Sequence, residues 1–331
     1  MTSNNWERIL TDMKIFVTGG TGFIGSHLVD LLVETGHEVA SYDASLNFID
    51  RPDYHKRCLD LRRKYIKNHP HKKYAGDIRD IGTLRENIQD FGPEIVVHLA
   101  GLPMARVADH YKKEMSSINM QGTLNVVEVF NELSSARRLV YTSSSMAYGH
   151  FKQHPQGETS ILDPVNEYGA CKAAGEYFVK LSEKEWVIVR PTSVYGFTDC
   201  ANRVTQLLMD RAYVKKPAWV VKGEALDFSY VKDVAKGFFS CVTVKEANHD
   251  TFNISRGDSR STEELAKLYK THFSDFVYEV KEPEKQQVWR GPLDISSARD
   301  KLKFDPEYDL EDGVEETLKL VKEYNFYKGL I

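Results

Sequence analysis

The sequence predicts an α/β protein: a doubly wound parallel sheet followed by a smaller, mixed α/β C-terminal domain. Three observations support this fold class. Apolar runs typical of buried parallel strands alternate with helical repeats as far as Pro191, the first of these runs ends at a glycine-rich turn, and the elements beyond Pro191 are shorter.

The first expected strand, residues 15–17, ends at a turn in which Gly19, Gly22 and Gly25 are spaced GxxGxxG. Behind the turn, apolar residues recur at helical spacing. Glycine at these positions permits a tight turn and lets the backbone approach a pyrophosphate, which the amides of the helix N-terminus then face. The turn therefore predicts a Rossmann-type dinucleotide site. A turn without a nucleotide is the alternative.

The second expected strand, residues 38–42, leads into Asp43. This acid lies about 20 residues beyond the glycines, where a carboxylate binds the hydroxyls of the adenosine ribose. Because a carboxylate also repels a 2′-phosphate, we expect the cofactor to be NAD rather than NADP.

A long polar excursion follows as far as about Pro70, and the lysines and arginines clustered in residues 56–73 are expected to form a solvated helix or loop. The β-α alternation then continues to Arg190. The expected strands are residues 74–80, 94–100, 138–143 and 186–190, with helices at 83–90, 116–133 and 168–184. The second half is expected to hold helices at 204–212, 262–273 and 310–324 and strands near Trp219 and Phe252.

The composition excludes several classes of protein. The 331 residues carry a net charge of −4, so no basic surface indicates nucleic acid or an anionic membrane. No apolar run approaches the length of a transmembrane helix, and residues 1–12 lack the apolar segment of a signal peptide. The four cysteines show no CxxC spacing, which predicts a reduced, cytoplasmic protein without a metal site: Cys58, Cys171, Cys200 and Cys241.

A second strong signal is the segment from Tyr168 to Lys172. Residues four apart share one face of a helix, so the phenol and the ammonium point the same way. A neighbouring cation favours the phenolate of a tyrosine, which can then take a proton from a substrate hydroxyl while hydride leaves the same carbon. The serine-rich strand end at 141–149 supplies a hydroxyl that orients the substrate, or that only caps the next turn.

These motifs have the order found in extended short-chain dehydrogenases/reductases, and the chain resembles their NAD-dependent epimerase/dehydratase family, whose best-known members act on nucleotide sugars. The resemblance covers nearly the whole chain. Its motifs are TGGTGFIG at 18–25, GDIRD at 76–80, HLAG at 98–101, NxxGT at 119–123, SSSMAYG at 143–149, YxxxK at 168–172, RPTSVYG at 190–196 and DFSYVKDVA at 227–235.

The resemblance implies roles for individual residues. Ser144, Tyr168 and Lys172 would be catalytic, and Lys172 would also hold the nicotinamide ribose. Asn119 would fix the helix that packs behind the tyrosine. The residues implied to bind NAD are Gly19, Gly22, Phe23, Ile24, Gly25, Asp43, Asp77, Ile78, Leu99, Ala100, Gly101, Asn119, Thr142, Tyr168, Lys172 and Thr192.

The resemblance also implies a domain organisation and an assembly. Residues 1–190 would form the NAD-binding Rossmann domain with the catalytic residues, and residues 191–331 would mainly bind the substrate, with a boundary expected to be discontinuous. Relatives pair through the helices after Asn119 and Tyr168, so we expect a homodimer. Four apolar residues either serve that pairing or pack against the sheet: Val126, Val127, Val129 and Phe130.

Two positions narrow the expected chemistry. In similar enzymes, the two residues after the catalytic hydroxyl differ between classes. They are a pair of acids in 4,6-dehydratases. The second is a glutamate in nucleotide-sugar decarboxylases and a cysteine in some 3,5-epimerase-reductases. This chain has Ser145 and Met146, neither of which can act as acid or base. An NAD-dependent 4-epimerase of a nucleotide sugar, working through a 4-keto intermediate, is the first hypothesis. A dehydrogenase or keto-reductase acting on such a sugar or a related derivative is the second, and a non-catalytic NAD sensor the third.

The sequence departs from the family at positions that help bind the diphosphate. Many relatives have a basic or polar residue where Pro103 stands, an arginine at Leu226 and an asparagine at Ser193. An arginine pairs with a phosphate through its planar guanidinium, which makes two arginines candidates here. The candidate substrate residues are Ser145, Ser193, Arg203 and Arg290.

Overall fold

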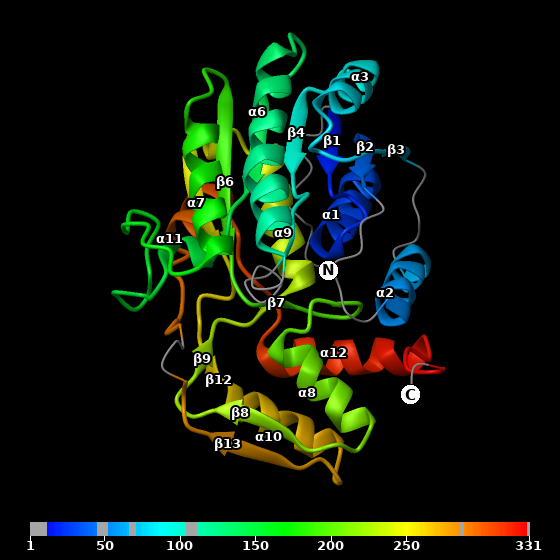
Figure 1. The fold of residues 1–331 in the computed structure, drawn as a ribbon, viewed down its shortest axis with the longest axis vertical. Coiled ribbons are helices and arrows are strands. Elements are labelled where there is room, and N and C mark those ends of the chain that lie inside the picture. The colour runs from blue at the N-terminus through cyan, green and yellow to red at the C-terminus, as the bar shows by residue number, and fades with distance from the viewer. Residues whose placement is uncertain (1–11, 45–51, 66–70, 104–110, 285–287, 330–331) are drawn as a thin grey trace, which may run out of the picture.

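Seven parallel strands form the central sheet, and helices cover both of its faces (Figure 1). The computed structural model describes residues 12–44, 52–65, 71–103, 111–284 and 288–329. The strand order is β11-β6-β5-β4-β1-β2-β3, with all neighbours parallel. The strands are β1 (Lys14–Thr18), β2 (Glu38–Asp43), β3 (Lys72–Ala75), β4 (Ile95–His98), β5 (Arg138–Thr142), β6 (Glu185–Pro191) and β11 (Asp250–Ile254).

The alternation of side chains along the strands divides the core into two layers. On one face, Ile15 and Val17 of β1 pack with α1 (Phe23–Glu34), α9 (Val231–Thr243) and α11 (Ser296–Leu302). On the other face, Phe16 packs with α3 (Ile81–Phe91), α6 (Gly122–Glu132) and α7 (Glu167–Lys180). The strands are apolar on both faces because both layers are buried, and this produces the continuous apolar runs in the sequence.

The C-terminal part of the chain lies at the carboxyl end of the sheet, at the bottom of Figure 1. Its main pair of strands is β8 (Ala218–Val221) with β13 (Tyr278–Lys281), packed against α8 (Val204–Tyr213) and α10 (Thr262–His272). The short pairs are β7 (Val194–Tyr195) with β10 (Ser229–Tyr230) and β9 (Ala225–Leu226) with β12 (Arg260–Ser261).

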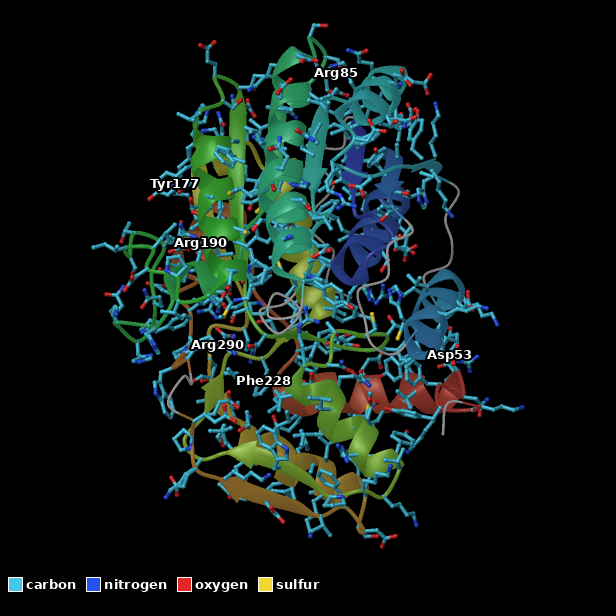
Figure 2. The ribbon with its side chains drawn as sticks, in the orientation of Figure 1. Asp53, Arg85, Tyr177, Arg190, Phe228 and Arg290 are labelled. Atoms are coloured by element: carbon cyan, nitrogen blue, oxygen red, sulfur yellow. The ribbon has the colours of Figure 1, made fainter. Side chains whose placement is uncertain are left out.

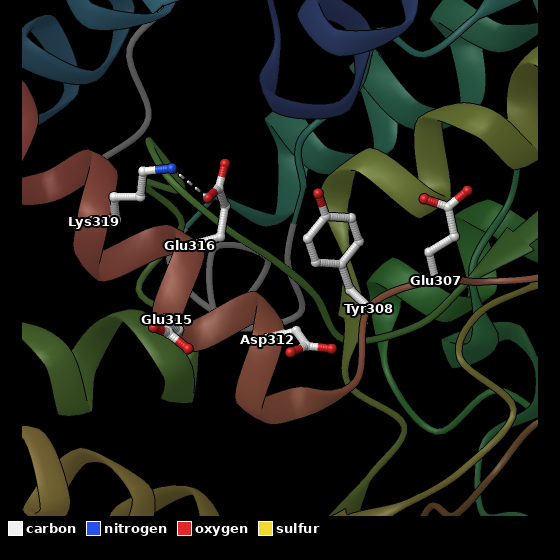
Figure 3. Close-up of a pocket in the computed structure, with 6 residues that line it drawn as sticks. All are labelled: Glu307, Tyr308, Asp312, Glu315, Glu316 and Lys319. Atoms are coloured by element: carbon white, nitrogen blue, oxygen red, sulfur yellow. Dashed lines mark ion pairs between the residues drawn. The ribbon is translucent and has the colours of Figure 1, made fainter. Parts of the chain in front are cut away.

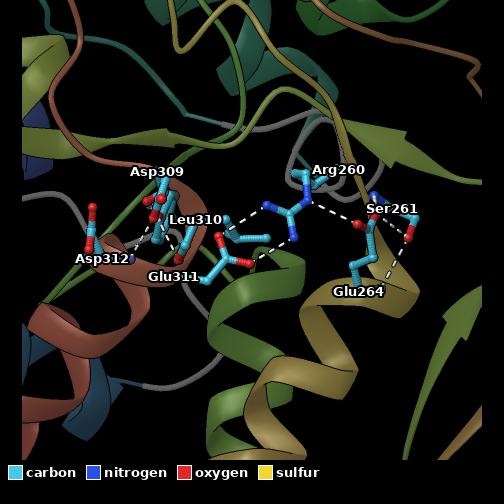
Figure 4. A network of polar contacts seen from close by, with 8 residues as sticks. Arg260, Ser261, Glu264, Asp309, Leu310, Glu311 and Asp312 are labelled. Carbon is cyan, nitrogen blue, oxygen red and sulfur yellow. Dashed lines mark hydrogen bonds and ion pairs between the residues drawn. The ribbon is translucent and has the colours of Figure 1, made fainter.

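A polar network fixes two helix N-termini in this part (Figure 4). The Arg260 guanidinium binds Glu311 in the first turn of α12 (Leu310–Glu323), with Nη2 2.7 Å from Oε1. Its Nε donates to Glu264 at 3.0 Å. Glu264 also completes a capping box with Ser261 at the start of α10. One arginine therefore holds the ends of α10 and α12 together.

Three elements refine or differ from the sequence-based expectations. The strand expected near Phe252, β11, pairs with β6 and extends the main sheet. The polar excursion after Asp43 contains a 14-residue helix, α2 (Pro52–Tyr65). The helix expected at 116–133 begins as α5 (Lys112–Ser116) and passes through a π-helical turn (Ser117–Gln121) before α6.

Of the two roles expected for four apolar residues of α6, packing against the sheet is the correct one. Val126, Val127, Val129 and Phe130 are all at most 5% exposed and belong to the core under the sheet. Other side chains of α6 and α7 are exposed instead.

None of the helices described here is long and apolar enough to cross a membrane. No group of three or more potential metal ligands occurs among the described residues.

A buried ion pair joins α7 to β6. The Arg190 guanidinium binds both oxygens of Glu176, with Nε–Oε1 at 2.8 Å and Nη2–Oε2 at 2.6 Å. Arg190 also donates to the Tyr148 hydroxyl at 2.8 Å, and Ser143 donates to Glu176. Both charged side chains are almost fully buried. Figure 2 shows Arg190 between the helix and the strands at the left of the sheet.

We expect the Glu176→Gln substitution to lower the free energy of unfolding by about 3–5 kcal/mol, because it leaves a buried guanidinium without its carboxylate. Urea denaturation measures the change. The control is Asp275→Asn, which removes the exposed partner of Lys215 and should have no measurable effect. Equal effects of the two substitutions would contradict this role of the buried pair.

Candidate active site

A cleft of about 1350 Å³ opens between the carboxyl end of the sheet and the C-terminal part. The strand order reverses between β1 and β4, and α/β proteins bind ligands at such a switch point. Every expected cofactor, catalytic and substrate residue lines the cleft except Asn119. Figure 2 shows Arg290 and Phe228 near the junction of the two parts.

A second depression, of about 340 Å³, lies beside α12 (Figure 3). Lys319 and Tyr308 line it together with four carboxylates, Glu307, Asp312, Glu315 and Glu316. This excess of negative charge would repel the phosphates of a dinucleotide. The larger cleft is therefore the candidate site.

The glycine-rich turn in the cleft is packed too closely for larger side chains. Gly19 has a φ of +75°, and a Cβ there would lie 2.7 Å from the amide nitrogen of Ala100. A Cβ at Gly25 would lie 2.1 Å from the carbonyl oxygen of Gly19. Gly22 is the N-cap of α1 and provides no side-chain cap. The first amides of this helix thus form a site for a pyrophosphate.

Asp43 lies beside this turn at the end of β2. Its Oδ1 accepts a hydrogen bond from the amide of Thr21 at 3.0 Å, while its Oδ2 is buried with no partner among the described residues. Burial raises the pKa of this carboxyl, and the hydrogen bonds with Thr21 oppose the shift. A buried carboxylate oxygen without a hydrogen-bond donor lowers the stability of the folded protein, and a ribose hydroxyl would supply that donor. This edge of the cleft therefore fits the adenosine half of NAD.

The walls next to Asp43 are fixed by short-range contacts. Asp77 binds the Arg79 guanidinium at 2.6 Å, which lowers the pKa of Asp77. Ile78 packs so closely on α6 that a Cβ at Gly122 would lie 2.5 Å from it. On the other side, residues 99–101 follow β4, and the amide of Ala100 donates to the Thr18 hydroxyl at 3.3 Å. All of these residues except Gly122, Arg79 and Thr18 line the cleft itself.

Ser144, Tyr168 and Lys172 meet at the carboxyl end of β5, beside the sites just described. The Ser144 hydroxyl lies close enough to the Tyr168 phenol to lower its pKa. Ser144 also accepts a hydrogen bond from the amide of Met146 at 3.2 Å, so it both caps the following turn and faces the tyrosine. The Lys172 ammonium donates to the carbonyl oxygen of Thr142 at 2.8 Å.

The electrostatic environment of the tyrosine differs from the sequence-based expectation. Burial raises the pKa of Tyr168, while the Ser144 hydroxyl and the positive charge of Arg203 lower it. Arg203 thus contributes a positive charge that favours the phenolate, and the sequence did not indicate this contribution. Lys172 lies 6.0 Å from the centre of the Tyr168 ring, and burial lowers the pKa of its own ammonium to about 8.

Asn119 acts through the loop after β4. Its amide nitrogen donates to the carbonyl oxygen of Leu102 at 3.0 Å, and its oxygen accepts the Leu102 amide at 2.7 Å. This double hydrogen bond resembles the pairing of two strands. Asn119 therefore fixes the cleft wall that residues 99–102 form, although its own side chain does not line the cleft.

The candidate substrate residues differ in how free their polar atoms are. The Ser145 hydroxyl donates to Thr192 at 2.8 Å and is fully buried. Arg203 binds Asp199 at 2.5 Å. By contrast, Nε of Arg290 is buried with no hydrogen-bond partner in the described structure, and burial lowers the pKa of its guanidinium. Of the two candidate arginines, Arg290 is therefore the one whose guanidinium lacks an anionic partner and would gain from binding one.

Two side chains that line the cleft were missed in the sequence. Arg62 of α2 was expected in a solvated charged segment, but it is buried and its Nη2 donates to the carbonyl oxygen of Thr198 at 2.6 Å. Asp199, in the loop before α8, positions Arg203. Neither residue belongs to a motif, and only the folded chain brings them to the cleft, so no local signal in the sequence identifies them.

Comparison with known proteins gives a consistent result. The chain is 26% identical over 337 residues to a UDP-glucose 4-epimerase from Mycolicibacterium smegmatis, and the match covers 94% of this chain and 99% of the relative. The crystal structure of a UDP-glucose 4-epimerase with UDP-glucose, from Thermotoga maritima, superposes with a TM-score of 0.81 at 26% identity, covering 95% and 100% of the two chains.

A UDP-glucuronic acid 4-epimerase from Bacillus cereus, solved with UDP-glucuronic acid and NAD, has a TM-score of 0.83 at 23% identity and supports the fold; the match covers 94% of this chain and 100% of that one. The sequence profile of the NAD dependent epimerase/dehydratase family matches residues 15–255, which hold the glycine turn, Ser144, Tyr168 and Lys172. The chain belongs to the NAD dependent epimerase/dehydratase family.

Proposed function

We propose that this protein is an NAD-dependent 4-epimerase of a nucleotide sugar, with a UDP-sugar as the first candidate substrate. The observation that carries the proposal is that Ser144, Tyr168 and Lys172 line the same cleft as the glycine turn. Relatives and structural neighbours named UDP-glucose and UDP-glucuronic acid 4-epimerases support the substrate class.

In this proposal the residues of the chain bind the substrate and move one proton. Ser144 orients the hydroxyl on C4 of the sugar, and Tyr168 takes its proton as a general base and later returns it. NAD, when bound, supplies the hydride acceptor and donor. Gly19, Gly22 and Asp43 would hold its pyrophosphate and ribose, and Lys172 its second ribose.

The residues around the tyrosine favour simple oxidation and reduction at one carbon. Met146 has no proton to exchange, and the Ser145 hydroxyl is engaged by Thr192. Elimination of water needs an additional acid and base at these positions, and neither side chain supplies one. We propose that Arg290 and residues of the C-terminal part bind the nucleotide diphosphate, since Nε of Arg290 needs an acceptor.

The first test is incubation with UDP-glucose, UDP-galactose, UDP-glucuronic acid and their GDP, CDP and dTDP counterparts. We expect one pair of C4 epimers to interconvert, with no net change in the absorbance of NADH. Accumulation of one NADH for each sugar consumed would favour the alternative, a dehydrogenase. No conversion of any sugar, with NAD bound, would support an NAD sensor.

The Tyr168→Phe substitution should lower turnover by about 10²–10⁴-fold, because it removes the general base. NAD binding, measured by fluorescence titration, should be nearly unchanged. Tyr177→Phe on the same helix is a matched control, since this tyrosine is 62% exposed and points away from the protein (Figure 2). Turnover at the unsubstituted rate in Tyr168→Phe would contradict the mechanism.

The Arg203→Gln substitution should move the rising limb of the pH–kcat profile to higher pH. The base form of Tyr168 is the phenolate, and loss of the Arg203 charge raises the pKa at which it forms. Arg203→Lys keeps the charge and should restore most of the profile. A lower kcat with an unshifted profile in Arg203→Gln would mean that this arginine acts only in binding.

We further propose that the protein is a cytoplasmic homodimer. Its four cysteines are free thiols, as is usual in a reducing compartment. Four large apolar side chains on the π-helical turn, on α6, on α7 and at the C-cap of α7 are exposed, by 38–80%: Met120, Leu124, Tyr177 and Leu181. Such a patch on two neighbouring helices is typical of a protein interface.

The Leu181→Lys substitution should convert the dimer into monomers in sedimentation velocity, because it places a charge in the apolar interface. Val277→Lys is the control, since Val277 is 57% exposed but lies in the C-terminal part. A sedimentation coefficient unaffected by Leu181→Lys would exclude this face as the interface.

A further inference from the structure

Two cysteines that are distant in the sequence lie together at one wall of the cleft. Cys58 belongs to α2, and Cys200 to the loop between β7 and α8. Both side chains belong to one buried cluster, and Arg62, one helical turn after Cys58 on α2, contacts Sγ of Cys200. Cys58 is fully buried, whereas Cys200 is 8% exposed and lines the cleft. A small solute in the cleft can therefore reach Cys200 first.

Arg62 holds the two cysteine-bearing segments together. Its Nη2 lies 3.4 Å from Sγ of Cys200, and its Nε donates to the Thr198 hydroxyl at 3.2 Å. On the other side, Nη1 donates to the carbonyl oxygen of Thr21 in the glycine-rich turn at 3.4 Å. One buried guanidinium thus connects α2, the loop and the cofactor turn.

The surroundings give the two thiols different reactivity. The neighbouring Cys58 thiol and the charge of Arg62 lower the pKa of Cys200, which favours its thiolate. Burial raises the pKa of Cys58. Burial also raises the pKa of Cys171 and of Cys241, which lie elsewhere in the fold. Only one of the four cysteines thus combines thiolate character with access to the cleft.

We propose that Cys58 and Cys200 are a redox pair, which a peroxide converts into a disulfide between α2 and the loop that carries Asp199 and Arg203. The Cys200 thiolate attacks one oxygen of hydrogen peroxide, breaks the O–O bond and becomes a sulfenic acid, while the departing hydroxide takes up a proton as water. The sulfur of Cys58 then attacks Cys200, and a second water leaves as the S–S bond forms. Two thiols are oxidised, and one peroxide is reduced to two waters.

The disulfide would restrict the cofactor end of the cleft. His55, Lys56 and Leu59 of α2 form one part of the cleft wall, and residues 199–205 form another. In the reduced protein only non-covalent contacts, chiefly those of Arg62, hold these two parts together. A covalent link prevents them from separating, so the oxidised protein should release NAD more slowly than the reduced protein.

The test is treatment of the NAD-bound protein with hydrogen peroxide, followed by thiol titration in denaturant. We expect the four thiols of the reduced chain to fall to two, and peptide mapping to find Cys58 joined to Cys200. Cys241→Ala, the matched control, should fall from three to one. Cys58→Ala has no second thiol at this site, so it should lose only Cys200, as a sulfenic acid that dimedone traps.

Three further outcomes decide the proposal. Persistence of four thiols, or a disulfide that involves other cysteines or a second chain, overturns the redox pair. If the Cys58–Cys200 disulfide forms but NAD release, measured by rapid filtration before and after a reductant is added, keeps the same rate, the effect on the cleft is overturned. Slower release that the reductant reverses, and that is absent in both Cys58→Ala and Cys200→Ala, supports the complete proposal.

Discussion

The arrangement of the site depends on the buried ion pair of Glu176 and Arg190. Tyr168 and Lys172 lie on α7, whereas Ser144 follows β5, so a fixed distance between helix and strand is needed for the three to meet. The bidentate pair ties α7 to β6, and Ser143 and Tyr148 extend it to the segment that contains Ser144. A buried ion pair tolerates little displacement, because separation of the two charges leaves the desolvation penalty of each without the attraction that offsets it.

Local patterns in the sequence were sufficient for much of the fold. The glycine turn, Asp43 and the segment from Tyr168 to Lys172 are short motifs whose spacing reflects local geometry, and the structure brings all of them to one cleft. The alternating apolar runs predicted β1, β4, β5 and β6, because parallel strands are buried on both faces. Residues close in sequence are constrained by the chain itself, which makes such predictions possible.

What the sequence did not indicate depends on long-range contacts. In the sequence, Arg62 belongs to a charged run that is expected to lie in solvent. Its contacts with Thr198 and Cys200 are with residues more than 130 positions away, so the surrounding sequence does not reveal them. The apolar residues of α6 are compatible with either a dimer interface or the core. The position of the sheet shows that Val126 and Phe130 belong to the core. Likewise, the charge of Arg203, which lies far from Tyr168 in the sequence and is paired with Asp199, lowers the pKa of Tyr168.

The position of β11 in the main sheet limits how such a protein can evolve. After β6 the chain leaves the sheet for β7 and α8, returns as α9 and β11, leaves again for α10 and returns as α11. A recombination event that exchanged everything after Pro191 would therefore also replace the edge strand of the sheet and two of its covering helices. New substrate preferences in this architecture are more readily acquired by point substitutions and loop insertions than by exchange of a whole module.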